Sequence, residues 1–296
     1  MSLHPPVPLR FAGNTSTIEL SPIVIAVQEA EATQVNVTWG GIWDVTSGKA
    51  EVATNGETQL LRFSVDDPDL RAILTVAEDR YRLAARKSAN IFSVADLRGK
   101  RITTPLDTTA HWYLLKLLRT ANLKESDVVL VPIEPWKEQI DALVKGDVDA
   151  MAMWEPDPEI ARDALGDDIV FVPGESGYKE IFALYASAKA LADSAKRAEI
   201  VKFVASIISV TERLNQNPQA YFPLISKSSG VSEKHLAAVW ADFTFPGKIT
   251  ENLLDILEEQ EIWVAERQER SARSRDDLAK LIDTDVYREA LSVGRR

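Results

Sequence analysis

Two adjacent threonines, Thr108 and Thr109, are the strongest candidates for ligand recognition in this sequence. They lie in the loop Pro105–His111, which follows the β-prone run Arg101–Thr104. The first N–H groups of a helix lack intrahelical partners and lie at the positive end of its dipole, so such a loop should hold a small anion or another polar ligand. A helix should begin beside the threonines, because apolar residues then recur at helical spacing: Ala110, Leu114, Leu117, Leu118 and Ala121.

The same loop also has simpler interpretations. Threonine is favoured at helix N-caps for local reasons, so Thr108 and Thr109 can serve the backbone alone, and from the residues alone this is the more frequent role. His111 is the third ligand candidate of the loop. A histidine within a helix more often makes structural hydrogen bonds than ligand contacts. The position of His111 beside the threonines nevertheless favours a role in ligand binding.

Tryptophan side chains form the second group of candidates, since an indole offers a flat face for stacking and one N–H group. Trp154 lies at the end of a predicted strand, where α/β proteins bind their ligands. Trp39 is expected to supply a facing wall, together with Trp43. An aromatic sandwich of this kind favours a ligand with a planar ring over nitrate or a short alkanesulfonate. Packing in the core competes for each of them, and most evenly for Trp112 and Trp136.

Polar residues near predicted strand ends complete the candidate site. Asn14 and Thr15 lie in a turn after one predicted strand of the N-terminal part, and Asn55 and Glu57 lie at the end of another. Glu57 and Glu155 are the carboxylates expected to accept hydrogen bonds from a ligand N–H group. Either can instead pair with an arginine, and for Glu57 the structural role is equally expected because carboxylates favour the first turn of a helix.

Composition excludes several classes of function. The formal net charge is −11 and no lysine and arginine cluster is interleaved with aromatic residues, so we expect no nucleic-acid partner. The chain has no cysteine, which excludes thiol nucleophiles, thiolate metal sites and disulfides. Its 3 histidines are far apart, and no glycine-rich phosphate loop or nucleophile elbow occurs. We therefore expect no metal site, no cofactor and no catalytic residue.

The length predicts two lobes, because 296 residues exceed the usual size of one hydrophobic core. Strands and helices alternate in both halves, as expected for parallel sheets covered by helices. Tyr81–Arg86 and Ile181–Ala186 are predicted to be the two strands that connect the lobes as a hinge. A long helix should follow, with an apolar stripe from Ile200 to Leu214 and an end near Asn217.

The C-terminal part is predicted to be helical from Ser232 onward. The run Glu258–Glu261 is expected to face water, and the charge-dense segment Arg267–Arg275 is expected to be a solvated surface. Core contacts should come from apolar residues of the same region: Leu253, Leu254, Leu257, Ile262 and Val264.

Two parts of the sequence resemble extracytoplasmic solute-binding proteins of ABC importers. Asp96–Ile102 followed by Thr108–His111 is similar to the second-lobe signature of that family, and Gly146–Pro156 is similar to its strand ending in Trp-Glu-Pro. The branch that it resembles serves nitrate, sulfonates, taurine and pyrimidine precursors of thiamine. The similarity is clearest from about Gly48 to Pro156.

The resemblance implies an α/β fold of the type II periplasmic-binding-protein class. Two α/β lobes would be joined by a two-stranded hinge, with a helical C-terminal segment, and a small solute would bind in the cleft between the lobes. Lobe 1 would comprise residues 1–86 and 187–296, and lobe 2 residues 87–186. The resemblance also favours ligand binding over simple capping for Thr108 and Thr109.

The implied function is the substrate-binding component of an ABC importer for a sulfonate, a nitrate-like anion or a pyrimidine precursor, and not an enzyme. The partners would be this small molecule and an ABC permease, and the chain would be a monomer that meets the membrane only through the permease or an unseen anchor. It would be periplasmic or otherwise extracytoplasmic. Met1–Pro6 lacks the basic and apolar regions of a signal peptide, so we expect that peptide to have been removed. The alternative is an enzyme or a cytosolic ligand sensor with the same fold.

Overall fold

The computed structural model describes residues 8–29 and 35–293, which form two compact units. The first unit contains the described residues up to Glu78, Ile181–Glu233 and those from Thr244 onward, and the second contains Asp79–Glu180 and 234–243. Met1–Pro6, on which the signal-peptide expectation rests, lies outside the described residues. Within the described ranges no helix is both long and apolar enough to span a bilayer.

The borders of the two units differ from the lobe borders expected from the sequence. The chain passes between the units after Glu78 and after Glu180, and a short C-terminal segment, 234–243, joins the second unit. The strand predicted at Tyr81–Arg86 exists as β5 (Arg82–Arg86), but it pairs within the sheet of the second unit. The strands at the borders are β4 (Leu70–Asp79) and β10 (Glu180–Ser187).

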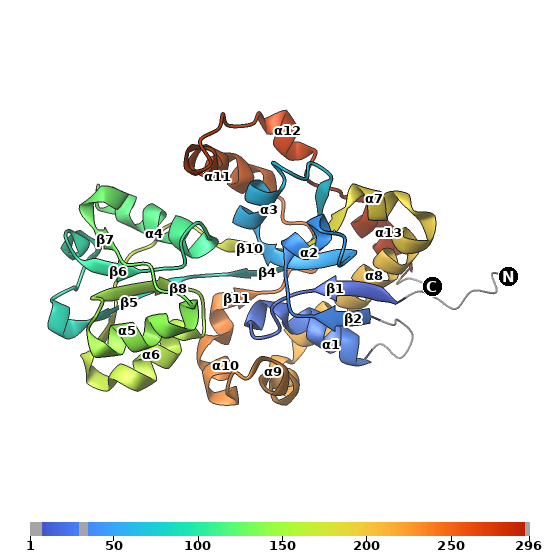
Figure 1. Cartoon of the computed structure of the whole chain (residues 1–296). Coiled ribbons are helices and arrows are strands. Elements are labelled where there is room, and N and C mark those ends of the chain that lie inside the picture. The colour runs from blue at the N-terminus through green and yellow to red at the C-terminus, as the bar shows by residue number, and fades with distance from the viewer. Residues whose placement is uncertain (1–7, 30–34, 294–296) are drawn as a thin grey trace. The chain divides into compact units, whose positions relative to one another are not determined.

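The first unit is built on a six-stranded sheet with the order β11-β4-β10-β3-β1-β2 (Figure 1). β1 pairs in parallel with β2 and β3, and β10 runs antiparallel to β3. β4 and β10 are buried along nearly their whole length, which explains why they read as continuous apolar runs rather than as alternating patterns. The other strands are β1 (Leu9–Ala12), β2 (Val35–Thr38), β3 (Val52–Gly56) and β11 (Phe243–Thr244).

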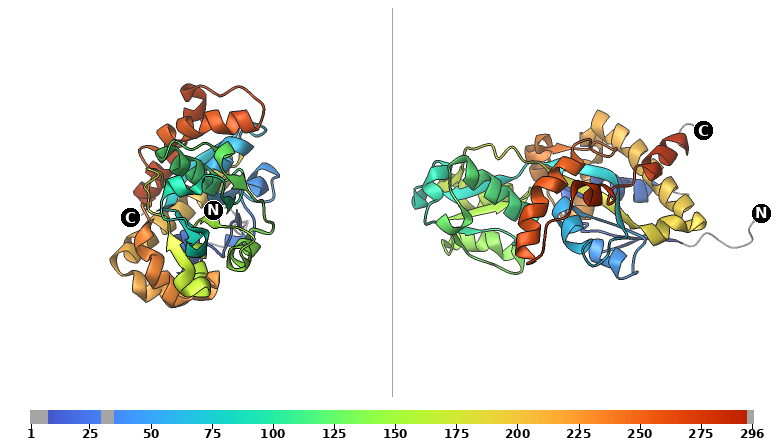
Figure 2. Two further views of the ribbon diagram at one scale, coloured as in Figure 1. Left: turned by 90° about the vertical axis from the view of Figure 1, so that its left-hand side faces the viewer. Right: turned by 90° about the horizontal axis from the view of Figure 1, so that it is seen from above.

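The long helix predicted after the hinge is confirmed as α8 (Ser194–Gln216). Asp193 caps it, because its Oδ1 accepts hydrogen bonds from the backbone N–H groups of Ala195 at 3.0 Å and Lys196 at 3.1 Å. Its apolar stripe packs against α1 (Ser21–Glu29). Helix α10 (Glu233–Val239) begins at the border between the units. The remaining helices of the first unit, seen from two further sides in Figure 2, are α2 (Ile42–Thr46), α3 (Glu57–Phe63), α7 (Ala188–Ala192), α9 (Phe222–Ser229), α11 (Leu253–Arg267), α12 (Arg275–Ala279) and α13 (Asp285–Val293).

The second unit has a five-stranded sheet with the order β7-β6-β8-β5-β9. β6 pairs in parallel with β7 and β8, so the carboxyl ends of β6 and β8 reach the same edge of the sheet. One face carries α4, and the other carries α5 and α6 (Figure 1). The bounds are β6 (Arg101–Thr103), β7 (Val129–Leu130), β8 (Ala150–Met153), β9 (Ile169–Phe171), α4 (Thr109–Thr120), α5 (Gln139–Lys145) and α6 (Asp157–Leu165).

The sequence-based prediction for α11 is partly wrong. Leu253, Leu257 and Val264 are buried as expected, but Ile262 is 60% exposed and Glu261 only 1%. Helix geometry explains both differences, because residues four apart lie on the same face of a helix. Glu261 follows Leu257 by four positions and therefore faces the core, whereas Ile262 points away from it.

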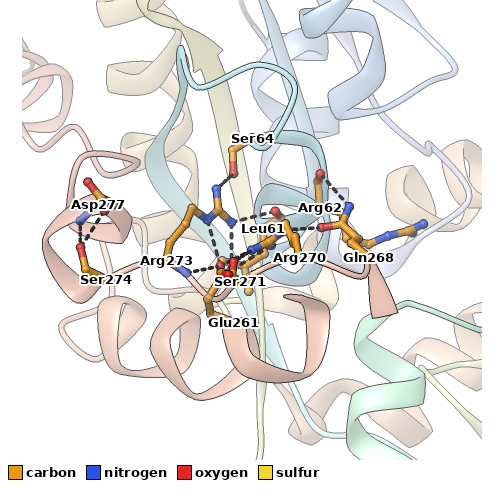
Figure 3. A network of polar contacts seen from close by, with 10 residues as sticks. All are labelled: Leu61, Arg62, Ser64, Glu261, Gln268, Arg270, Ser271, Arg273, Ser274 and Asp277. Carbon is orange, nitrogen blue, oxygen red and sulfur yellow. Dashed lines mark hydrogen bonds and ion pairs between the residues drawn. The ribbon is translucent and has the colours of Figure 1, made fainter. Parts of the chain in front are cut away.

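Glu261 is buried because it binds two arginines of the following charged segment, which was expected to be a solvated surface. Its Oε2 accepts from Arg273 Nη2 at 2.9 Å and from Arg270 Nη2 at 3.2 Å (Figure 3). Arg273 also donates to Ser64 Oγ at 2.7 Å and to the carbonyl of Leu61 at 2.8 Å. The segment therefore binds the C-terminal end of α3, where helix carbonyls lack intrahelical partners.

Replacing Glu261 by alanine should lower the free energy of unfolding by about 3 kcal/mol, because two arginines lose their carboxylate in a buried position. Burial alone would raise the pKa of Glu261, but the hydrogen bonds from Arg273 and Arg270 outweigh it and lower the pKa. The stabilisation is therefore present above the unfolded pKa and is lost as the pH falls through the folded one. Urea unfolding at several pH values measures both effects.

The matched control is Glu258→Ala on the same helix, because Glu258 is exposed where it pairs with Arg275. This variant should lose less than about 1 kcal/mol. Equal losses for the two variants would show that the Glu261 network contributes no more than a surface ion pair.

Candidate functional site

The N-terminus of α4 lies where the sequence predicts it, and Thr108 is its cap. Thr108 Oγ1 accepts a hydrogen bond from the Ala110 N–H group at 3.2 Å and donates one to the carbonyl of Pro105 at 2.7 Å. The local role that the sequence allowed for Thr108 is therefore present. It holds the loop at the carboxyl end of β6 in a fixed conformation.

Thr109 connects the start of α4 to a buried pair of carboxyl groups. Its hydroxyl lies 2.7 Å from the Tyr81 hydroxyl and donates to Glu180 Oε1 at 2.9 Å, and only 4% of Thr109 is exposed. Burial raises the pKa of Glu180, while hydrogen bonds from Asp79, Tyr81 and Thr109 oppose that change. The N-terminus of α4 thus already has a carboxyl group of the protein beside it.

Five aromatic side chains of the second unit form what we call the aromatic cluster: Tyr81, Tyr113, Trp136, Trp154 and Tyr178. Ring centroids are 5.5 Å apart for Trp136 and Trp154, and 6.5 Å for Trp154 and Tyr81. Tyr81 also contacts Tyr113 at 5.6 Å and Tyr178 at 6.3 Å, both edge to face. The three tyrosines are buried, whereas Trp136 and Trp154 are half-buried and keep part of their rings accessible.

The cluster brings together residues that are distant in sequence. Trp154 follows β8 and Tyr81 precedes β5, and these two strands are antiparallel neighbours in the sheet. Trp136 begins a short 3-10 helix, Trp136–Glu138, that leads into α5. From the sequence, Trp112 and Trp136 could each either pack in the core or belong to the binding site. Trp136 belongs to the aromatic cluster, whereas Trp112 is buried and only 1% exposed.

Glu155 is fully buried and pairs with an arginine, which is the alternative that the sequence allowed for it. One of its oxygens accepts from Arg82 Nε, and Arg82 Nη2 also donates to Glu159 at 3.0 Å. The guanidinium group of Arg82 lies 4.0 Å from the ring centroid of Phe171. Burial raises the pKa of Glu155 although Arg82 acts against it. Its other oxygen, Oε2, is buried and receives no hydrogen bond within the described part of the chain.

Asp157 is a site residue that the sequence reasoning missed. It is the first residue of α6, its N–H group donates to the carbonyl of Trp154 at 3.3 Å, and only 9% of it is exposed. Burial, with the charge of Glu155, raises the pKa of Asp157 to about 7, while Lys137 acts against the shift. An aspartate in the first turn of a helix is ordinarily an exposed complement to the helix dipole, so nothing in the local sequence indicates this burial.

His111 has structural contacts at both ring nitrogens. It is fully buried, its Nδ1 accepts from the Asp107 N–H group at 3.2 Å, and its Nε2 lies 3.6 Å from Glu125 Oε1. Because Nδ1 accepts, the proton of the neutral ring is on Nε2 and faces Glu125. This arrangement fixes the loop before α4, as expected for a structural histidine.

In the first unit, two polar candidates hold backbone turns. Asn14 Oδ1 accepts from the Ser16 N–H group at 3.1 Å, and Asn55 Oδ1 accepts from the Ile42 N–H group at 2.6 Å. Thr15 is half-buried in the same turn as Asn14. The two asparagine side chains therefore stabilise the loops that follow β1 and β2.

The other two candidates of this unit differ in exposure. Glu57 is fully buried, and its Oε2 accepts from the Ile181 N–H group at 2.9 Å while Oε1 accepts from Gln260. Trp39 is 70% exposed, with its ring centroid 6.4 Å from that of Trp43. Glu57 is thus hydrogen-bonded within the protein, which is one of the two roles expected from the sequence. Trp39 offers an exposed aromatic face.

Replacing Asp157 by asparagine should change how stability depends on pH. The folded pKa of about 7 lies above the ordinary value of 3.8, so the folded chain binds more protons than the unfolded chain between these values. Stability should therefore fall as the pH rises from about 4 to 7, by roughly 4 kcal/mol for a shift of about 3 units. Asp157→Asn should remove this loss and be more stable than the natural chain at pH 8.

Thermal unfolding between pH 5 and pH 8 measures this effect. The matched control is Asp141→Asn, which removes the same charge from an exposed position on α5. If both variants show the pH dependence of the natural chain, the ionisation of Asp157 is not coupled to folding.

Comparisons with known proteins agree with this architecture. A search of curated proteins gives no match. The alkanesulfonate-binding protein SsuA of Xanthomonas axonopodis pv. citri, bound to MOPS, superposes with a TM-score of 0.76 at 15% identity, covering 96% of this chain and 100% of that one. The periplasmic aliphatic sulphonate-binding protein SsuA of Escherichia coli gives 0.77 at 16% identity, covering 95% and 93%.

The same fold also occurs in an enzyme. A DszB variant in complex with biphenyl-2-sulfinic acid superposes with a TM-score of 0.72 at 16% identity, covering 97% of this chain and 99% of that one. At such identities the likeness establishes the periplasmic-binding-protein fold, as the sequence predicted, and nothing finer. The family model described as NMT1/THI5 like matches residues 40–220. The chain therefore belongs to the NMT1/THI5-like family.

Proposed function

We propose that this protein is the solute-binding component of an ABC importer and that it binds a small solute with a planar ring on the aromatic cluster of its second unit. The position of Trp154 carries the proposal. This half-buried indole follows a parallel strand of the sheet, and its ring packs against those of Trp136 and Tyr81. Ligands of α/β proteins bind beyond the carboxyl ends of such strands.

Among the ligand classes expected from the sequence, a ring-bearing solute fits the cluster better than nitrate or a short alkanesulfonate. Aromatic side chains bind through contact area and ring geometry, and a nitrate ion or a two-carbon chain offers little of either. The biphenyl-2-sulfinic acid of the DszB complex supports this choice, because it is an aromatic, ring-bearing solute bound by a protein of the same fold.

As a solute-binding component, the chain would act outside the cytoplasm and deliver its solute to a membrane permease. The described residues of the second unit bind the ring in this proposal. Contacts from Asn14, Thr15, Trp39 and Asn55 of the first unit remain predictions.

Binding without conversion is part of the proposal. The fold alone does not decide this, since a desulfurization enzyme shares it. A chain without cysteine has no thiol nucleophile, and the buried carboxyl groups of Glu155 and Glu159 are paired with Arg82.

A thermal-shift and tryptophan-fluorescence screen tests the proposal. Ring-bearing probes of different charge, namely benzyltrimethylammonium, benzyl alcohol and benzenesulfonate, should include at least one that raises the melting temperature and changes the fluorescence, whereas nitrate and taurine should do neither. Trp154→Ala should weaken binding of that probe at least about tenfold through lost stacking and contact area. Mass spectrometry should recover the probe unchanged.

The control is Trp240→Phe, which alters a half-buried tryptophan of the second unit outside the cluster and should retain binding. Binding of taurine or nitrate without any ring-bearing probe would contradict the ligand class. Chemical conversion of a bound probe would contradict the assignment as a binding protein.

A further inference from the structure

The positive charge of Arg82, beside the aromatic cluster, is already neutralised. Both Glu155 and Glu159 bind Arg82, and Glu159 also binds Arg162. With both carboxylates ionised, these four groups carry no net charge. Arg82 therefore has no charge left over for an anionic ligand.

The start of α4 does not supply the missing positive charge. Its dipole amounts to about half an elementary charge at the N-terminus. The hydroxyl of Thr109, at the first position of the helix, already donates to the buried carboxyl group of Glu180 at 2.9 Å. Glu180 and Asp79 also carry charge next to Tyr81, and together with burial this raises the pKa of Tyr81. The protein's own carboxyl groups thus oppose an anion at this end of the helix.

One buried acceptor near the cluster lacks a donor, and a second carboxyl group lies close to it in the chain. Glu155 follows Trp154 directly, and its Oε2 is fully buried without a hydrogen bond from the described residues. Its charge acts on Tyr113 of the cluster, where burial and Glu155 raise the pKa of the phenol. Asp157, on the same turn, is 9% exposed. A buried oxygen such as Glu155 Oε2 ordinarily has a donor, so it fits a ligand that brings one.

Aromatic rings at this part of the unit already accept cations of the protein. Lys137 Nζ lies 5.5 Å from the ring centroid of Trp136. Trp136 and Trp154 are edge to face at 5.5 Å. The charge of Lys137 also acts on Asp157, so the lysine connects the ring of Trp136 with this carboxyl group. A ring face next to a carboxylate is a favourable environment for an ammonium group.

We infer that the aromatic cluster takes a small organic cation, with an ammonium or similar cationic nitrogen on or beside a flat ring, in preference to a sulfonate-type anion. The inference rests on the proposed solute-binding function and specifies its ligand class. Stacking on Trp154 supplies the contact area, Glu155 Oε2 supplies a hydrogen-bond acceptor, and the ionised carboxylate of Asp157 supplies the compensating charge.

Isothermal titration with three matched probes at pH 8 tests this selectivity. Benzyltrimethylammonium, benzyl alcohol and benzenesulfonate share the ring and differ in charge. The cation should bind at least about tenfold more tightly than the neutral probe, and the anion should bind most weakly. Equal affinities, or tightest binding of benzenesulfonate, would overturn the inference and leave the solute-binding function standing. Failure of all three, with no binding in the wider screen, would overturn both.

A variant series tests the role of Asp157. A quaternary ammonium does not titrate, so any change of its affinity with pH comes from the protein. Asp157 faces Glu155 and Lys137, and the pair of Asp79 and Glu180 lies beside Tyr81. Between pH 6 and pH 8 the affinity should rise several-fold as Asp157 ionises, and Asp157→Asn should abolish this rise and bind several-fold more weakly at pH 8.

Asp141→Asn is the control, because it removes one charge from an exposed position of the same unit and should retain both the affinity and the pH profile. Misfolding does not explain a loss of binding in Asp157→Asn, since that variant is expected to be more stable at pH 8. An unchanged affinity and pH profile in Asp157→Asn would overturn the assignment of Asp157 to the cation site.

Discussion

The ion pair of Arg82 with Glu155 and Glu159 is the constraint on which the aromatic cluster of the second unit depends. Arg82 opens β5, Glu155 lies in the turn after β8, and Glu159 lies in the first turn of α6, so one guanidinium group connects three elements. Because both carboxylates are buried, breaking the pair would leave an uncompensated charge. The turn that carries Trp154 is therefore held firmly, and its indole is presented at a defined position beside Trp136.

A comparable arrangement holds α3 in the first unit. Its first residue, Glu57, accepts hydrogen bonds from Gln260 and from the Ile181 N–H group, and its C-terminal end is bound by Arg273. Two neighbouring positions of α11, Gln260 and Glu261, thus hold opposite ends of the same helix. In both units, loops at the carboxyl ends of strands are positioned by buried polar groups that lie far away in the sequence.

The fold of this protein does not by itself determine the chemistry of the ligand. The fold is shared with sulfonate-binding proteins and with a desulfurization enzyme at identities near 15%, so it places a site without specifying its charge. The charge is set by a few side chains on the loops. Here Glu180 lies beside the N-terminus of α4, and Glu155 and Glu159 bind Arg82, so carboxyl groups of the protein already lie at both of these positive groups.

The sequence alone determined the α/β class, the main strands and helices, and the start of α4, because these follow from local hydrophobic periodicity and capping. It also singled out Trp154 and Thr109 as candidate ligand-binding residues, which remains a prediction. Only the tertiary structure decided that Glu261 is buried, that Asp157 lies in a buried environment, and that Glu155 binds Arg82. These outcomes depend on which distant residues become neighbours, and the pKa of a carboxyl group follows from those neighbours and from burial rather than from the local sequence.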